Sequence, residues 1–194
     1  PMPGSGFTYD VLPLADGAVL VATDGNGIIR IERDGSARTL PGARAGHRTF
    51  YSLCADSAGN AWAGGPAAGV YRVERDGLVA IPTDAGIVMN ELFSLAAFGG
   101  RIFILGDGGA FLLDPASGRT TELTNALGLR GAKAELNTMT TDADGSLWIA
   151  ADPGLYRLSP TLMRRGPGLK AAVTSVRQGA EELPRAEVPQ PQRL

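Results

Sequence analysis

Residues 142–158 read Asp-Ala-Asp-Gly-Ser-Leu-Trp-Ile-Ala-Ala-Asp-Pro-Gly-Leu-Tyr-Arg-Leu. The stretch starts with an Asp-Gly turn signal and continues with an apolar run around Trp148. It then reaches a second glycine, Gly154, before a run that alternates apolar and polar residues. Such runs between glycine-containing turns are typical of β-strands. The stretch therefore predicts two short strands joined by a tight turn.

This pattern occurs four times along the 194 residues. The first glycine of each copy lies at positions 17, 59, 100 and 145, which are 42, 41 and 45 residues apart. The second glycines, separated by 42, 40 and 45 residues, are Gly27, Gly69, Gly109 and Gly154. The two sets of glycines change their spacing in parallel from one copy to the next, so chance is a poor explanation. The chain is therefore built from internal repeats.

Each copy holds about 40 residues, enough for four strands, which is the size of one propeller blade. The sequence therefore predicts an all-β fold, a β-propeller with four blades of four antiparallel strands. The blades are expected at about residues 7–42, 49–83, 91–124 and 135–162.

One position is bulky in every repeat, and its residues are Leu20, Trp62, Phe103 and Trp148. A single blade cannot bury both of its faces, so these side chains are expected to pack between blades. If Trp148 is buried in this way, its replacement by alanine should cost roughly 3–5 kcal/mol. A second repeated position holds Arg30, Arg72 and Arg157, for which a solvated strand face or blade-to-blade hydrogen bonding is favoured over a ligand role.

The fourth repeat closely resembles the two-component regulator propeller repeat, whose pattern is D-x-x-G-x-L-W-I-G-T-x-x-G-L-x-R. The residues that match are Asp142, Gly145, Leu147, Trp148, Ile149, Gly154, Leu155 and Arg157, whereas Ala150 and Ala151 replace its Gly-Thr pair. The resemblance covers about residues 9–160. It implies the periplasmic sensor region of a membrane-anchored histidine kinase or diguanylate cyclase, compatible with a dimer in the parent receptor. Members usually carry more than four blades, so the resemblance favours an incomplete arc that is part of a larger ring over a closed four-blade propeller, which is also physically possible.

The C-terminal segment, residues 163–194, is expected to be a linker. In the same family the last blade is often followed by a small immunoglobulin-like domain named for three tyrosines. Residues 170–184 resemble the first strand of that domain, so this segment is also expected to hold the start of a truncated copy.

Composition excludes several classes of function. A net charge of −2 and a pI of about 5.4 argue against nucleic acid as a partner. The single cysteine, Cys54, excludes an internal disulfide and is expected to be a small buried hydrophobe. His47 is the only histidine and no G-x-S-x-G motif occurs, so no metal, no cofactor and no catalytic residue are expected. No apolar run is long enough to span a bilayer, and no membrane contact by this segment is expected.

A ligand is expected at the loops that lead into the first strand of each blade, because these loops open onto one face of a propeller. The loops are residues 41–50, 83–92 and 124–136. The candidate ligand-binding residues are Arg44, His47, Arg48, Asn90 and Asn137, and the same loops also carry Glu91, Lys133 and Glu135. Such a mixed polar set suits a polar small molecule such as a glycan fragment.

The leading hypothesis is a signal-input module that binds a polar ligand or a partner protein and is not itself an enzyme. One alternative is a propeller enzyme, a lyase or a glycan hydrolase, for which His47 would be the best candidate base. The other is a purely structural interaction scaffold.

Overall fold

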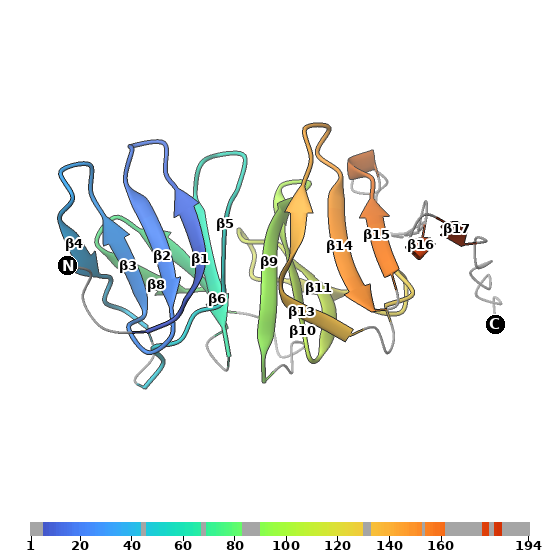
Figure 1. The fold of residues 1–194 in the computed structure, drawn as a ribbon, viewed down its shortest axis with the longest axis horizontal. Coiled ribbons are helices and arrows are strands. Elements are labelled where there is room, and N and C mark those ends of the chain that lie inside the picture. The colour runs from blue at the N-terminus through green and yellow to red at the C-terminus, as the bar shows by residue number, and fades with distance from the viewer. Residues whose placement is uncertain are drawn as a thin grey trace.

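The computed structural model describes residues 6–43, 46–66, 69–82, 90–129, 133–152, 154–161, 176–178 and 181–183. Within these ranges the chain forms four antiparallel sheets that follow one another in the sequence. Figure 1 labels their strands, with the N-terminal sheet towards the left and the C-terminal sheet towards the right. Each sheet is one blade, and the four are numbered here in chain order.

The strands of each blade are hydrogen-bonded in sequence order. Blade 1 contains β1 (Thr8–Pro13), β2 (Val19–Thr23), β3 (Ile28–Ile31) and β4 (Ala37–Thr39). Blade 2 contains β5 (Ser52–Ala55), β6 (Ala61–Gly65), β7 (Gly69–Glu74) and β8 (Gly77–Ala80). Blade 3 contains β9 (Leu92–Phe98), β10 (Arg101–Gly106), β11 (Gly109–Leu113) and β12 (Thr120–Glu122). Blade 4 contains β13 (Lys133–Thr141), β14 (Leu147–Asp152), β15 (Gly154–Leu158), β16 (Val176–Gln178) and β17 (Glu181–Leu183).

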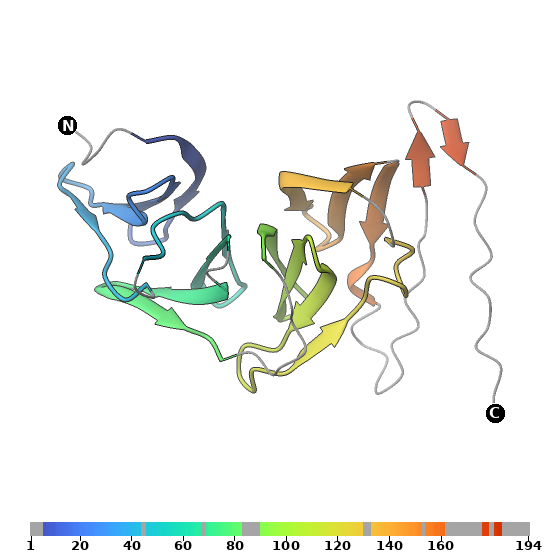
Figure 2. The ribbon, with the colours of Figure 1, turned by 90° about the horizontal axis from the view of Figure 1, so that it is seen from below.

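The blades stand side by side along an arc, as the view from below shows (Figure 2). This arrangement confirms the predicted β-propeller architecture with four antiparallel blades. The first strands of the blades, β1, β5, β9 and β13, contact one another in turn and form the inner side of the arc. That the arc belongs to a larger ring stays a prediction.

Three apolar clusters hold the arc together, one between each pair of neighbouring blades. Leu20 and Ala22 of blade 1 pack against Ala63 and Tyr71 of blade 2. The other two clusters are built alike, with Trp62 and Val70 against Ile104 and Phe111, and Phe103 and Leu105 against Ile149 and Tyr156. Because strand side chains alternate between the two faces, each blade supplies one set of residues to each neighbour.

The Asp-x-x-Gly turn explains why the repeat keeps an aspartate six residues before its tryptophan. In blade 4 the Asp142 carboxylate accepts hydrogen bonds from the backbone N–H of Ser146 at 2.9 Å and from the Trp148 indole N–H at 2.7 Å. Asp56 does the same in blade 2, where it accepts from the Asn60 N–H at 2.9 Å and from the Trp62 indole at 3.2 Å. One carboxylate therefore closes the turn and fixes the tryptophan.

The bulky repeat position always faces the next blade along the chain. Leu20 and Phe103 are fully buried and Trp62 is 3% exposed, as expected for packing between blades. The expectation fails for Trp148, which is only half-buried, and its neighbour Leu155 is 37% exposed. The reason is that Trp148 points away from blade 3, and within the described residues no further blade covers that face.

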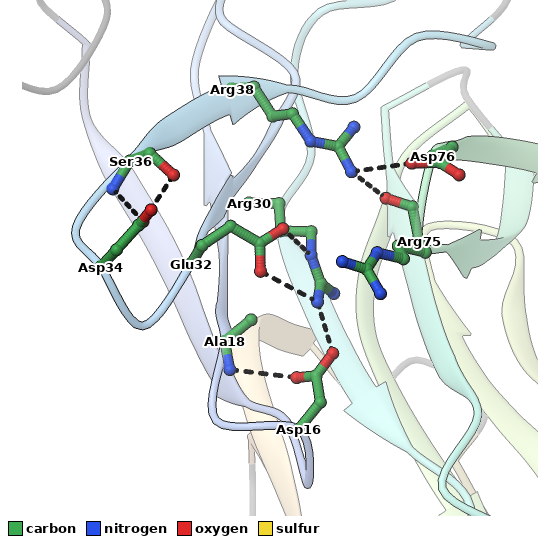
Figure 3. Close-up of polar contacts among 9 residues, drawn as sticks. All are labelled: Asp16, Ala18, Arg30, Glu32, Asp34, Ser36, Arg38, Arg75 and Asp76. Carbon is green, nitrogen blue, oxygen red and sulfur yellow. Dashed lines mark hydrogen bonds and ion pairs between the residues drawn. The ribbon is translucent and has the colours of Figure 1, made fainter.

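The repeated arginines make ion pairs with residues of their own blade. Arg30 is buried between blades 1 and 2, where its guanidinium bonds Glu32 at 2.8 Å and also Asp16 (Figure 3). Arg157 pairs with Asp144 at 2.6 Å, which is the position equivalent to Asp16. These pairs join the first turn of the blade to its third strand. Beside Arg30, Arg38 crosses to blade 2 and bonds Asp76 at 3.1 Å (Figure 3).

Beyond β15 the described residues add two strands to blade 4. Val176 and Leu183 belong to β16 and β17, which extend the sheet of blade 4 as its fourth and fifth strands. The free edge of β15 has unpaired main-chain groups that favour such pairing. The assignment of this segment to a separate domain stays a prediction. Among the residues described, no helix is long and apolar enough to cross a membrane.

Candidate functional site

The inner strands carry a second repeat that runs through all four blades. An aromatic residue, a small or acidic polar residue and an aliphatic residue follow one another in blades 1 to 3, and an asparagine takes the aromatic position in blade 4. The four tripeptides are Tyr9-Asp10-Val11, Tyr51-Ser52-Leu53, Phe93-Ser94-Leu95 and Asn137-Thr138-Met139. This register brings Tyr9, Tyr51 and Phe93 to the same level of the arc.

In blades 1 and 2 the middle residue of the tripeptide accepts a hydrogen bond from the backbone of the next blade. Asp10 accepts a hydrogen bond from the Leu53 N–H at 2.7 Å, and the Ser52 hydroxyl accepts one from the Leu95 N–H at 3.0 Å. The third member, Ser94, is 1% exposed, and its hydroxyl has no partner in the described part of the chain. The hydrogen-bond ladder between inner strands therefore stops at blade 3.

Asn137 explains where the ladder stops. Its φ is 53°, the only positive φ of a residue other than glycine in the described ranges. The pairing of β13 with β14 jumps from Ala134 to Met139 at this point. The Asn137 amide donates to the backbone oxygens of Tyr9 at 2.9 Å and Tyr51 at 2.8 Å, while its own carbonyl oxygen is buried without a partner among described residues. The side chain thus ties blade 4 to blades 1 and 2.

A cavity of about 550 Å³ opens beside this irregular segment. Its walls come from the inner strands of blades 2, 3 and 4 and from the turn between β10 and β11. The lining residues are Tyr51, Glu91, Phe93, Gly106, Asp107, Ala134, Glu135 and Leu136. This set combines two aromatic rings with three carboxylates, and it is called the axial pocket below.

The aromatic wall of the axial pocket is fixed by its neighbours. The rings of Tyr9 and Tyr51 meet edge to face with centroids 4.8 Å apart. Burial raises the pKa of the Tyr51 hydroxyl, and the nearby charges of Tyr9, Glu91 and Asp24 raise it further. Tyr51 therefore stays a neutral hydrogen-bonding group at physiological pH.

The carboxylate wall is partly held in place by backbone donors. Asp107 accepts hydrogen bonds from the Asn90 N–H at 3.0 Å, the Glu91 N–H at 3.1 Å and the Asn90 side-chain amide at 3.2 Å. Glu91 and Glu135 are both exposed. All the donors to Asp107 are uncharged, so they orient this carboxylate without cancelling its charge.

The residues expected to bind a ligand do not meet in one place. His47 and Arg48 line a separate pocket of about 470 Å³ together with Asn26 and Thr39. Its floor is stabilised by a hydrogen bond from the Gly27 N–H to the Arg48 carbonyl at 2.7 Å. Asn90 and Asn137 instead lie next to the axial pocket and position its walls. Arg44 lies outside the described residues, as does most of the loop 83–92.

Sequence reasoning missed Tyr9, Tyr51 and Phe93. Their spacing of 42 residues matches that of the glycine markers, so the signal was present in the same repeat. It was hidden because aromatic residues in a strand normally indicate core packing. The described residues contain no group of three His, Cys, Asp or Glu side chains that could hold a metal ion.

No family model matches this chain, and no curated protein matches its sequence. Solved structures do resemble it. A streptogramin B lyase is 12% identical with a TM-score of 0.64, and 79% of this chain aligns with 52% of the lyase. A proposed gluconolactonase is 15% identical with a TM-score of 0.62, and 89% of this chain aligns with 64% of it.

The extracellular domain of a proposed hybrid two-component system from B. thetaiotaomicron is also similar. It is 15% identical with a TM-score of 0.60, and 89% of this chain aligns with 25% of that chain. This chain therefore spans about half to two-thirds of the two enzymes and a quarter of the two-component protein. At this level of identity the similarity shows the fold alone, which is the β-propeller.

Proposed function

We propose that this chain is an extracytoplasmic input module of a membrane-bound signalling protein of the two-component regulator propeller family. In this role it senses a small polar ligand, such as a glycan fragment, that binds in the axial pocket. The observation that carries the proposal is the composition of that pocket, in which Tyr51, Phe93 and Glu135 come from three different blades. A ligand there would contact all three blades at once.

Two further features support a binding role. Aromatic rings and acceptor groups in one concave site are the usual means of holding a polar ligand. The wall made by β13 is also the place where the regular ladder between blades is interrupted at Ser94 and Asn137. Irregular backbone and unpaired buried polar groups gather at functional sites more often than elsewhere. The similar two-component protein fits this role but identifies no ligand.

The proposal is tested with the 194-residue chain and a panel of neutral and charged mono- and oligosaccharides. Ligand-observed NMR should detect binding, and Phe93→Ala should weaken it at least tenfold because one wall of the pocket is removed. Phe7→Ala is the matched control, since Phe7 is 75% exposed and does not line this pocket. Binding that survives Phe93→Ala unchanged would place the ligand elsewhere and contradict the proposal.

A lyase is the second candidate because one specific feature favours it. The histidine-to-alanine variant of the Staphylococcus aureus virginiamycin B lyase, which has a similar fold, is catalytically inactive. In this chain His47, the only histidine, lines a pocket of about 470 Å³. Incubation with a streptogramin B substrate should give no turnover if the chain is a binding module. Turnover that His47→Ala abolishes would favour the lyase instead.

A further inference from the structure

The charges around the axial pocket all have one sign. Three of its eight lining residues are carboxylates, Glu91, Asp107 and Glu135, and none of the eight is Lys, Arg or His. In the described ion pairs of the chain, neither Glu91 nor Glu135 has a basic partner. The described lining of the pocket therefore carries a net negative charge.

The same negative potential acts on the aromatic wall. The charge of Glu91 is among the causes that raise the pKa of the Tyr51 hydroxyl, after burial and the neighbouring Tyr9. An anion placed beside Tyr51 would meet the same repulsion. A positive charge would be attracted by Glu91 and Glu135, and its attraction would be strongest where water is excluded.

Two aromatic rings add a second preference for positive charge. Tyr51 and Phe93 occupy equivalent repeat positions on neighbouring blades and both line the cavity. An aromatic face attracts a cation through its quadrupole, and the attraction is stronger where water is excluded. The edge-on contact from Tyr9 holds the Tyr51 ring in position. Carboxylates and aromatic rings around one cavity are thus complementary to an ammonium group on a compact body.

We propose that the axial pocket selects a small organic cation, a molecule of cavity size that carries an ammonium group, between the Tyr51 and Phe93 rings and the Glu91 and Glu135 carboxylates. This inference rests on the proposed function, since it names the class of ligand for the same pocket. The pocket around His47 and Arg48 makes a natural contrast, because its described lining holds no carboxylate and no benzene ring.

Two probes of nearly the same shape but different charge test whether the axial pocket prefers a cation. Choline carries a quaternary ammonium, and 3,3-dimethylbutan-1-ol replaces that nitrogen by carbon and is neutral. Isothermal titration of the 194-residue chain should show choline binding at least tenfold more tightly than the alcohol. Between pH 6 and 8 choline is permanently charged and the alcohol is neutral. The ratio of their affinities should therefore not change with pH through ionisation of the probes.

The double variant Glu91→Gln/Glu135→Gln should remove most of this preference. It keeps the size of both side chains, which are exposed, so the fold should be retained. Choline affinity should fall about tenfold, while the affinity of the alcohol should stay within twofold. Glu122→Gln is the control, because Glu122 is an exposed glutamate on β12 outside the pocket.

The outcomes separate this inference from the proposed function. Equal affinity for the two probes, or no choline binding at millimolar concentrations, would overturn selection of a cation. If a neutral or anionic saccharide then bound in a manner lost in Phe93→Ala, the sensing role of the pocket would stand while the inferred ligand class would fall. Choline binding that is unaffected by both Phe93→Ala and the double variant would contradict the site itself.

Discussion

The ladder between inner strands allows a sharp test of how the blades are joined, using two serines in equivalent positions. Ser52 is 2% exposed, and its hydroxyl accepts the Leu95 N–H of the next blade at 3.0 Å. Ser52→Ala would leave that buried N–H without an acceptor. An unsatisfied buried donor costs about 1–3 kcal/mol, so we expect the free energy of unfolding to fall by about 2 kcal/mol.

Ser94→Ala should behave in the opposite way. Ser94 is equally buried, but its hydroxyl has no partner among the described residues. Removal of an unpaired buried hydroxyl removes the free-energy cost of keeping that group away from water, and it leaves a cavity no larger than one oxygen atom. We therefore expect a change between zero and about 1 kcal/mol of stabilisation. The two variants remove the same atom from the same repeat position, so side-chain size and strand propensity cancel in the comparison.

Urea unfolding followed by far-ultraviolet circular dichroism measures both variants. The midpoint should shift while the slope with denaturant stays constant, because the surface exposed on unfolding is nearly unchanged. A difference of about 2 kcal/mol between Ser52→Ala and Ser94→Ala would support the ladder. Equal destabilisation by the two substitutions would refute it, since the Ser94 hydroxyl would then have a partner as good as that of Ser52.

Three other predictions concern burial and charge. Trp62→Ala should lower the free energy of unfolding by about 4 kcal/mol, and Trp148→Ala should lower it by about 2 kcal/mol less. Both variants lose an indole hydrogen bond, but only Trp62 is buried between blades. Equal losses of stability in urea unfolding would contradict this. Burial of Cys54 against the core between blades 2 and 3 raises the pKa of its thiol to about 12. Iodoacetamide at pH 7.5 should therefore label Cys54 slowly in the folded chain and rapidly in urea. Fast labelling of the folded chain would count against this packing. The Ala18 N–H and then the Arg30 guanidinium lower the pKa of Asp16, and the Arg30 guanidinium lowers the pKa of Glu32. The stabilisation by these two carboxylates is therefore present above about pH 4 and is lost as the pH falls through the lower folded values. Arg30→Gln should partly flatten this part of the stability profile, and an unchanged profile would refute the role of the ion pairs.

Much of the fold follows from the sequence because two glycines mark each blade. The glycine markers Gly59 and Gly69 of blade 2 lie in the turn before β6 (Ala61–Gly65) and at the start of β7 (Gly69–Glu74). Gly27 and Gly69 open the third strands with φ values of 76° and 75°, which side chains larger than hydrogen rarely adopt. Local turn chemistry and strand pattern agree at these points, so the propeller architecture could be predicted.

The environment of Trp148 could not be predicted in the same way. The repeat pattern says that this residue is equivalent to Trp62, and the Asp142 hydrogen bond shows that the local geometry is indeed the same. Burial, however, depends on what stands beyond the sheet. Arg157 lies over the Trp148 ring at 5.4 Å and shields part of it. A pattern within one blade holds no information about a neighbour on its outer face.

The axial pocket was only partly accessible to sequence reasoning. Glu91 and Glu135 were noted in the loops expected to face a ligand, although Glu135 lies in β13, and the residues selected as ligands were chosen for their polarity. Asn137 shows why this choice misleads: its amide is used to bond the carbonyls of Tyr9 and Tyr51 and so to hold the inner strands together. The contact spans 128 residues of sequence in one case, and no local pattern encodes such a partner.

The position of the pocket has a physical reason that joins these observations. A propeller with an unbroken ladder of inner strands would repeat the contacts of Asp10 and Ser52 in every blade and leave its inner wall uniform. In blade 4 the aromatic position holds Asn137, whose positive φ turns the backbone and shifts the register between Ala134 and Met139. Glu135 and Leu136 have no partner in the register between β13 and β14, and together with Ala134, which pairs with Ala151, they form one wall of the pocket. The irregular backbone at Asn137 thus leaves the Ser94 hydroxyl without a partner among the described residues and also forms the concave surface of the pocket. We therefore expect ligand binding to be coupled to the stability of the junction between blades 3 and 4.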